Sequence, residues 1–318
     1  MTTVYLHIGI PKTGTTSLQN FLLKNRENLL AQGILYPTSG ITINPNFNCF
    51  QSGDHNLFWA LDKECKAYDS NAGDWEDIHR EIKTKKSDLS KVLISAEDFS
   101  TINDNRLSLL KEHLSRYNTK VIVYLRKQDD YFMSFYCEYI KICRYWDSPI
   151  KYIEDNKNFG DYYQLLKRWK KAFGKENIIV RVFDRTNLKG GLINDFLMAT
   201  NLNLDELKLN FISKNKNVTP SIKLIKIMRF LNEFYRGRMH KSPMRLKKLY
   251  KQTVLSSGNP ISSMVSNLPD SLISPELLTT QERIDLMKEF EESNRKVAQE
   301  YLGREDGKLF DSTPDNMT

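Results

Sequence analysis

A short apolar segment that leads through a glycine-rich loop into a helix places the strongest constraint on this chain. Residues 6–22 read LHIGIPKTGTTSLQNFL, with an apolar run into Gly9 and a helical pattern from Thr16 onward. A turn of this kind directs backbone N–H groups and the positive end of a helix dipole toward one point. A phosphate or sulfate group is therefore expected to bind the loop residues Pro11, Lys12, Thr13, Gly14, Thr15 and Thr16.

The lysine of this loop occupies a different position from the lysine of nucleotide-binding loops. The usual motif is G-x-x-x-x-G-K-[ST], with the lysine directly after the second glycine. Gly9 and Gly14 keep the glycine spacing, but Thr15 occupies the lysine position and Lys12 lies inside the loop. A lysine at that place lies beside the anion, where it can neutralise the oxygen of a leaving group.

Strand-like and helix-like segments alternate through the first two thirds of the chain. Strands are expected at 4–8, 91–95, 120–125 and 177–183, and helices at 16–32, 104–116, 129–144 and 161–173. Residues 34–75 look irregular, and the last third looks helical, with an amphipathic stretch near 275–303. The alternation predicts an α/β fold, in which helices flank a P-loop-like, doubly wound parallel sheet and a helical C-terminal part follows.

The domain organisation is expected to be simple, because no sharp linker interrupts the sequence. We expect one domain over residues 1–318, with the core sheet in about 1–210, a helical and partly basic part in about 211–310, and a tail at 311–318. No apolar run approaches the ~18 residues of a membrane span, and the N-terminus lacks signal-peptide features. The four cysteines, Cys49, Cys65, Cys137 and Cys143, form no CxxC pair, which is typical of reduced thiols in a cytoplasmic protein.

Positive charge is concentrated in one segment. The chain has a formal net charge of +8, yet residues 222–251 alone hold ten Lys or Arg and a single acid, Glu233. Such a patch favours an anionic partner, such as a sulfated or uronic glycan, a membrane surface or a nucleic acid. A solvated helix face without a specific partner is the alternative interpretation.

The sequence PKTGTT after an N-terminal strand resembles the 5′-phosphosulfate loop of sulfotransferases that use 3′-phosphoadenosine 5′-phosphosulfate (PAPS). A second stretch, VIVYLRKQDDYFMSFYCEYIK at 121–141, agrees with this family. The resemblance covers nearly the whole chain and is strongest to bacterial sulfotransferases that act on carbohydrates. It implies PAPS as co-substrate, no metal requirement, and a glycan or other hydroxyl-bearing acceptor, with no nucleic acid expected.

The resemblance also assigns the group that binds the donor's 3′-phosphate. In that family an Arg at the end of a core strand and a Ser eight residues later hold this phosphate, and Arg126 and Ser134 have that spacing. A guanidinium at the carboxyl end of a parallel strand is well placed and well shaped for a phosphate. Taken alone, Arg126 is equally consistent with an ion pair to Asp129 or Asp130.

The chain departs from the cytosolic aryl sulfotransferases of animals in one respect. Their C-terminal Arg-Lys-Gly phosphate clamp is missing from this sequence, so the residues that cover the adenosine are not identified. The stretch SKNKNVTPS at 213–221 is a candidate replacement loop.

Sulfuryl transfer to an alcohol needs a base for the acceptor hydroxyl, and two residues are candidates. Glu97 lies just past the strand at 91–95, so it is expected at the same sheet edge as Lys12 and Arg126. Glycan sulfotransferases commonly use a Glu, and Glu97 is preferred to its neighbour Asp98. His55 is the second candidate for the base, or an acceptor contact, although a His in an Asn/Gly-rich loop is more often a surface residue.

Two other functions compete with sulfotransfer. A P-loop kinase would use the acids of ISAED near residue 97 to hold Mg²⁺, but Thr15 in the lysine position counts against it. A nucleotide- or glycan-binding protein without turnover would rely on the basic segment, and intact Lys12 and Glu97 argue against that interpretation. The sequence leaves the acceptor and the oligomeric state open.

Overall fold

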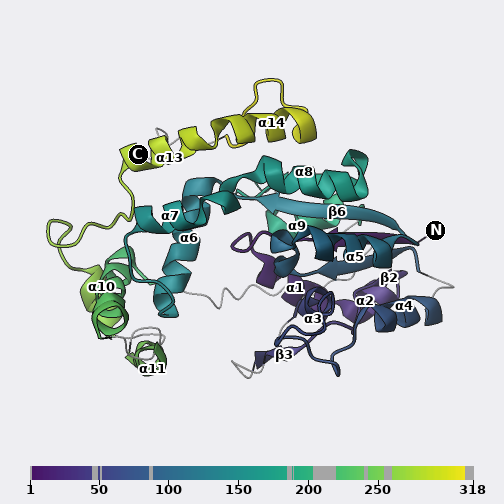
Figure 1. Ribbon diagram of the computed structural model, residues 1–318, viewed down its shortest axis with the longest axis horizontal. Helices are drawn as coiled ribbons and strands as arrows, with labels where there is room; N and C mark the ends of the chain where they lie inside the picture. Colours follow the sequence, from purple (N-terminus) through teal and green to yellow (C-terminus); the bar gives the residue numbers. More distant parts are fainter. Residues whose placement is uncertain are drawn as a thin grey trace. The chain divides into compact units, whose positions relative to one another are not determined.

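Five apolar strands pair into one parallel sheet, in the order β2-β5-β1-β6-β7 (Figure 1). In chain order they are β1 (Thr3–His7), β2 (Ile34–Leu35), β5 (Lys91–Ser95), β6 (Asn118–Leu125) and β7 (Ile178–Val182). All four pairings between them are parallel. The predicted α/β fold with a parallel sheet is therefore confirmed. A separate hairpin joins β3 (Ile43–Asn44) to β4 (Cys49–Phe50).

The computed structural model describes residues 2–44, 49–50, 52–85, 89–184, 188, 190–202, 220–239, 243–253 and 260–311. The chain divides into two units, each built from separate stretches of sequence. The sheet unit contains residues 1–126, 162–213 and 293–309, and the helical unit contains 127–161, 214–292 and 310–318. The expectation of one domain over the whole chain stays a prediction.

Both faces of the sheet are buried, as a doubly wound fold requires. On one face Tyr5, Leu93 and Ile122 belong to a core cluster that also holds side chains of α1 (Thr15–Lys24) and α9 (Gly191–Ala199). The alternate strand positions, such as Val4 and Val123, are buried on the other face. There α8 (Tyr162–Phe173) packs on β6 and β7 and contacts α5 (Asp104–Leu114).

Shorter helices complete the sheet unit. They are α2 (Arg26–Leu30), α3 (His55–Trp59), α4 (Trp75–Thr84), η1 (Glu97–Thr101), η3 (Lys175–Asn177) and most of α14 (Glu291–Leu302). The helix α14 lies beside α8, where Lys170 pairs with Glu300 at 2.5 Å and Ser293 Oγ accepts the Tyr163 N–H at 3.1 Å.

The helical unit is held by aromatic side chains and by one buried amide. Its elements are α6 (Gln128–Lys141), α7 (Pro149–Asn156), η2 (Lys157–Gly160), α10 (Ile222–Asn232), the π-helix η4 (Glu233–Arg238), α11 (Pro243–Thr253), α12 (Pro260–Ser266) and α13 (Thr280–Glu289). Asn232 donates to the carbonyl oxygens of Ile140 (2.8 Å) and Tyr145 (3.0 Å) and accepts from Tyr250 (2.9 Å). These bonds tie α10 to α6 and α11.

Two expected long helices are each broken in two. The predicted helix 16–32 ends at Lys24 and resumes at Arg26, because the Asn25 amide donates to Phe21 O at 2.9 Å and competes with the backbone ladder. The amphipathic stretch 275–303 divides at Phe290 into α13 and α14. Apolar periodicity runs through both breaks, so it could not reveal them.

The structure also describes the side chains of three of the four cysteines and the length and polarity of the helices. Cys65 is half-buried and Cys137 and Cys143 are buried, and all three are free thiols. Within the described ranges, every helix is too short or too polar to span a bilayer.

Candidate active site

The phosphate loop is the turn from Gly9 to Gly14 between β1 and α1. Its backbone takes positive φ angles at Gly9 (+21°), Lys12 (+70°) and Gly14 (+83°). The helix α1 has no acidic residue in its first turn, and no side chain caps its N-terminus. The start of α1 is therefore compatible with an anion, and the binding of an anion by the loop residues stays a prediction.

Gly14 is required by space as well as by conformation. A Cβ atom at this position would lie 2.5 Å from Leu192 Cδ2 on α9 and 3.4 Å from a ring carbon of Phe183. Both neighbours belong to the packed core or lie against it. A side chain at this glycine would require Leu192, which is half-buried, to shift, and the φ of +83° would strain it whatever the space.

The three threonines of the loop have different surroundings. Thr13 donates its hydroxyl to Ile10 O at 2.6 Å, so it braces the loop from within. Thr15 is 2% exposed, and its hydroxyl has no hydrogen-bond partner among the described residues. Thr16 is exposed. A buried hydroxyl without a partner is costly, so Thr15 Oγ1 is the group of the three that most needs a ligand.

Arg126 lies against the phosphate loop. It directly follows β6, which is the neighbour of β1 in the sheet, and its Nη1 donates to Lys12 O at 3.0 Å. Its guanidinium also stands 5.9 Å from the ring centroid of Phe183, and the Tyr162 hydroxyl donates to Arg126 O at 2.5 Å. The structure therefore brings together the two motifs that lie more than 100 residues apart in the sequence.

Arg126 and the phosphate loop lie where open α/β sheets are known to bind their ligands. From β1 the chain turns toward β2 at one edge, and from β6 it turns toward β7 at the other. Ligands of such sheets bind outside the carboxyl ends of the strands where the direction of winding reverses.

Ser134 and the acids near Arg126 belong to the helical unit. Ser134 is half-buried on α6, and its pairing with Arg126 stays a prediction. Asp129 and Asp130, the alternative partners weighed for Arg126, lie 2.9 and 3.6 Å from the guanidinium of Arg283 in their own unit.

The two candidate bases lie at the carboxyl end of β5. Glu97 is half-buried and is the first residue of η1, and Asp98 follows it. His55 begins α3 and is 8% exposed, so it is a buried residue and not the surface residue that its sequence context suggested. His55 Nδ1 lies 2.7 Å from Asp98 Oδ2, across 43 positions of sequence.

The acids around His55 change its proton affinity. Burial alone would lower the pKa of His55, but the hydrogen bond to Asp98 and the charges of Asp98, Glu97 and Asp54 raise it above its ordinary value. A raised pKa favours the protonated ring, which donates hydrogen bonds, over the neutral ring that a base requires. The choice between Glu97 and His55 as the base stays a prediction.

A buried polar cluster of His7, Gln19, Asp54 and Ser95 lies next to these residues. The Ser95 hydroxyl lies 2.8 Å from His7 Nδ1 and 3.3 Å from Gln19 Nε2, and the Ser95 N–H donates to Asp54 at 2.8 Å. Burial lowers the pKa of His7 to about 3. Burial also raises the pKa of Asp54 to about 8, against the hydrogen bond from Ser95.

Sequence reasoning did not identify Asp54, Ser95 or Gln19, and it passed over Asp98. The only local signal was the run of polar residues at the ends of β1 and β5, which could have suggested that they meet at one sheet edge. Their pairing depends on contacts between segments 41 to 88 residues apart.

The basic segment 222–251 is partly structural. Lys223 is buried, pairs with Asp270 at 2.6 Å and donates to Leu268 O. Arg236 donates to Cys143 O at 2.8 Å and stacks over Trp146. Lys241, the side chains of Arg238 and Lys251, and most of the candidate loop 213–221 lie outside the described residues.

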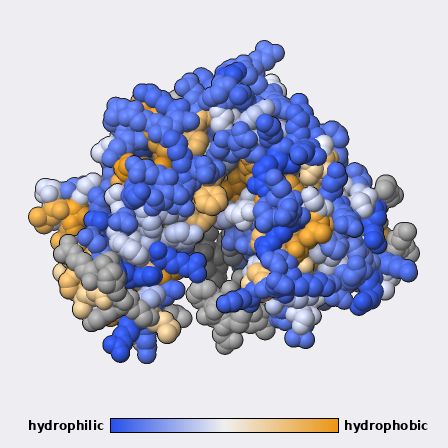
Figure 2. All heavy atoms as spheres, viewed as in Figure 1, coloured by the Kyte–Doolittle hydropathy of each residue, from blue (hydrophilic) through white to orange (hydrophobic). Residues whose placement is uncertain are grey.

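Apolar side chains are also exposed in this segment. Phe230 is 61%, Phe234 is 45% and Met244 is 75% exposed. Figure 2 shows hydrophobic patches among mostly hydrophilic residues on the face that it presents. Segment 222–251 is therefore not a uniformly charged, solvated surface, as the alternative interpretation of its sequence supposes.

A polar hollow of about 610 Å³ lies beside α4. Its lining includes Ser39, Asn71, Asp77, Arg80 and Glu81. None of the residues that line it is a predicted site residue, so it adds nothing to the candidate active site.

The chain resembles two known proteins. It is 29% identical over 215 residues to an uncharacterized protein of Archaeoglobus fulgidus, a match that covers 67% of this chain and 54% of that protein. The chain thus spans about half the length of the curated relative that it matches. It is also similar to the crystal structure of a sulfotransferase from Alicyclobacillus acidocaldarius, with a TM-score of 0.43 and 13% identity over 75% of this chain and 96% of that one.

The chain also matches a protein family. Residues 4–186 match the sulfotransferase domain family, a range that runs from β1 past β7 and covers more than half of the 318 residues. That range includes the phosphate loop, Glu97 and Arg126. Because the family match covers more than half of the chain, the phosphate loop and Arg126 included, the chain belongs to the sulfotransferase family.

Proposed function

We propose that this protein is a sulfotransferase that moves the sulfuryl group of PAPS to a hydroxyl group, with a glycan as acceptor. The observation that carries the proposal is the contact between Arg126 and the phosphate loop, because it supplies two anion-binding elements at one sheet edge. PAPS has two anionic ends, a 5′-phosphosulfate and a 3′-phosphate. The buried, unpartnered Thr15 hydroxyl fits a ligand with oxygen atoms at the loop.

Each residue then has a distinct task. The loop N–H groups, Thr15 and Lys12 hold the 5′-phosphosulfate, and Lys12 stabilises the negative charge that grows on the phosphate oxygen as the S–O bond breaks. Arg126 and Ser134 hold the 3′-phosphate. Glu97 takes the proton from the acceptor hydroxyl as its oxygen attacks sulfur in line with the leaving oxygen. His55, fixed by Asp98, orients the acceptor by donating a hydrogen bond.

The donor is tested by calorimetry with product analogues. Adenosine 3′,5′-bisphosphate is expected to bind more tightly than ADP with Mg²⁺, because only the bisphosphate offers a 3′-phosphate. Equal or tighter binding of ADP–Mg²⁺ would favour a P-loop kinase and contradict the proposal.

The role of Arg126 is tested in the same way. Arg126→Ala should weaken the bisphosphate by about 2–4 kcal/mol, as expected for a buried charge pair that loses one partner. Adenosine 5′-phosphosulfate lacks the 3′-phosphate and serves as the matched control, so its affinity should change little. An equal loss for both ligands would show that Arg126 acts mainly by bracing Lys12 O.

The acceptor class is tested by sulfate transfer from labelled PAPS to a panel of neutral glycans, anionic glycans and phenols. A glycan acceptor predicts that label appears in at least one glycan and not in the phenols. Transfer to phenols alone would place the chain among the aryl sulfotransferases. Donor binding with no transfer to any hydroxyl would indicate a binding protein without turnover.

A further inference from the structure

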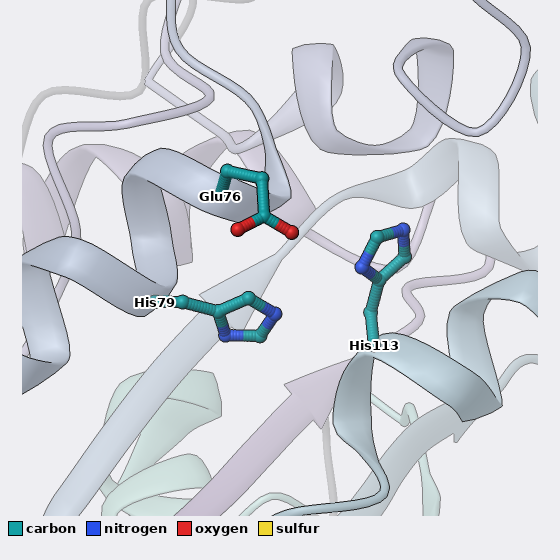
Figure 3. Close-up of side chains that lie close together, drawn as sticks. All are labelled: Glu76, His79 and His113. Carbon is teal, nitrogen blue, oxygen red and sulfur yellow. The ribbon is translucent and has the colours of Figure 1, made fainter.

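A second group of ligand-type side chains lies away from the candidate active site. Glu76 and His79 are three positions apart on α4, and His113 lies in the last turn of α5. One ligand atom from each lies within 4.8 Å of the others. Figure 3 shows the Glu76 carboxylate above the two imidazole rings, with a ring nitrogen of each histidine turned toward the space between the three side chains.

The ring of His79 is oriented so that one nitrogen can bind a ligand. The residue is 8% exposed, and its Nε2 is buried with no hydrogen-bond partner among the described residues. Its other ring nitrogen, Nδ1, lies 2.9 Å from the Tyr117 hydroxyl. With the Nδ1 proton donated to Tyr117, the lone pair of Nε2 points into the cluster, which is the arrangement that metal-binding histidines adopt.

His113 is held in place by its neighbours. Its ring stacks on Trp75 with centroids 5.3 Å apart and an interplanar angle of 13°. Trp75 is itself fixed, because its Nε1 donates to Leu57 O at 2.9 Å. Two rings of the cluster are therefore positioned by the fold, while Glu76 is exposed and able to adjust.

The surroundings favour a cation over an anion. The carboxylates of Glu76, Asp74 and Glu112 act on these histidines, and Arg116 is the opposing charge.

We propose that Glu76, His79 and His113 bind one Zn²⁺ ion, with a water molecule as the fourth ligand. Two imidazoles and one carboxylate form a common protein ligand set for zinc, with bond lengths of about 2.0–2.2 Å. At these bond lengths, two atoms bound to one tetrahedral ion stand about 3.4 Å apart, so binding must draw the three ligand atoms together from the present limit of 4.8 Å. Rotation of the exposed Glu76 side chain can bring its oxygen nearer to the rings.

The place of this site in the fold gives it a structural task. The helix α5 begins after η1 at the carboxyl edge of the sheet and ends just before β6 starts at the amino edge. His113 thus lies at the opposite edge from the phosphate loop. An ion here fastens α4 to α5 and closes a loop of chain that contains β5 and Glu97, so it stabilises the fold without taking part in sulfuryl transfer.

The experiment uses the full chain without an affinity tag, since a histidine tag would itself bind zinc. After removal of metals with a chelator, calorimetry with Zn²⁺ should show one ion per chain with a Kd of micromolar or below. Thermal unfolding should shift upward by several degrees on adding Zn²⁺. Co²⁺ in place of zinc should give the strong visible absorption of a tetrahedral site.

Two variants and one control locate the site. His113→Gln and Glu76→Gln should each weaken Zn²⁺ by at least tenfold and remove the upward shift in melting temperature. Glu112→Gln lies on the same helix and removes a nearby charge but no ligand, so it should change the affinity by less than threefold. His79 is avoided because its buried ring also packs in the fold.

Three outcomes overturn the proposal. The first is the absence of stoichiometric Zn²⁺ binding in the wild-type chain. The second is unchanged affinity in both His113→Gln and Glu76→Gln, which would place the ion elsewhere. The third is a weak, octahedral Co²⁺ spectrum. Each of these readouts is independent of sulfotransfer, so the result stands whether or not the proposed activity is found.

Discussion

His55 and Glu97 both lie near the carboxyl end of β5, but the proposed mechanism gives them different roles. The pKa of His55 is raised although its ring is buried, because Asp98, Glu97 and Asp54 outweigh the cost of burying the imidazolium. In the proposed function, the Glu97 carboxylate accepts a proton and the His55 imidazolium donates a hydrogen bond to the same acceptor hydroxyl. Deprotonation and orientation would then be divided between two residues.

Glu97→Gln keeps the shape of the side chain and removes the base. Loss of a general base costs about 10²–10⁴ in rate, so kcat should fall by that factor while the affinity for adenosine 3′,5′-bisphosphate stays unchanged. His55→Asn should lower kcat less, and Asp98→Asn should resemble His55→Asn because it releases the same ring. Steady-state kinetics and calorimetry on the three variants measure both quantities.

The opposite result would reassign the base. If His55→Asn abolished turnover while Glu97→Gln remained active, the imidazole would be the proton acceptor. The Asp98 carboxylate would then serve to orient it and to stabilise its charge, as in other paired His and Asp sites.

Asp54 predicts a loss of stability as the pH rises from 3.8 toward 8. Its folded pKa of about 8 lies above the unfolded value of 3.8, so the folded state binds the extra proton between these two values. Its contribution is fully present below pH 3.8 and is lost as pH rises through 8. The free energy of unfolding should fall by at most about 1.4 kcal/mol per pH unit in that window.

Asp54→Asn should flatten this dependence, because the amide mimics the protonated acid. Urea unfolding at pH 6.5 and 8.5 compares the two chains above the range of His7, whose contribution changes only between about 3 and 6.5. The pKa of His55 is also raised, so His55 adds a loss of stability of the same sign in this window. His55→Asn should keep only the part of the slope that Asp54 causes. A slope in Asp54→Asn equal to that of the wild type would contradict the assignment.

In the proposed function, donor binding depends on the phosphate loop. Gly14→Ala introduces a Cβ atom 2.5 Å from Leu192 at a φ of +83°. The left-handed backbone costs about 1–2 kcal/mol, and Leu192, which is half-buried, must also shift to admit the Cβ atom. Both the melting temperature and the affinity for adenosine 3′,5′-bisphosphate should fall.

Gly191 offers a matched control on α9. It has the same φ of +83°, but a Cβ atom there would meet nothing within 4 Å. Gly191→Ala should therefore carry only the cost of the backbone and leave donor affinity unchanged. Equal losses of affinity in the two variants would mean that general destabilisation, and not the shape of the loop, weakens binding.

Elements with strong local signals were predicted well. The strand 91–95 has the predicted bounds, and the phosphate loop lies between a strand and a helix as expected. The break at Asn25 was missed, because it depends on one side chain that bonds to Phe21 O. Likewise the bond between His55 and Asp98 joins two elements whose contact only the tertiary fold creates.

At the scale of the whole chain, charge is the dominant feature. The segment 222–251 carries a net charge of +9 within a chain of +8, so the remainder is close to neutral. Some of these cations have structural partners, Lys223 and Arg236 among them. Removing those two would disturb the helical unit and confuse any test of acceptor binding.

Arg245, Lys247 and Lys248 on α11 are better targets for that test. If the segment attracts an anionic acceptor, neutralising all three should raise the acceptor KM severalfold and weaken its dependence on salt. Donor affinity should stay the same. Initial rates at low and high ionic strength measure the effect, and an unchanged KM would return the segment to a solvated surface.

Lys12 has one consequence that reaches beyond catalysis. Its φ of +70° is one that a lysine adopts only at a cost of about 1–2 kcal/mol, whereas glycine adopts it freely. Directed evolution that selects for heat resistance alone should therefore favour Lys12→Gly, and under the proposed function the resulting proteins would be more stable and inactive. Screens for thermostable forms of this protein would then need an activity step, because stability and the proposed turnover place opposite demands on one residue.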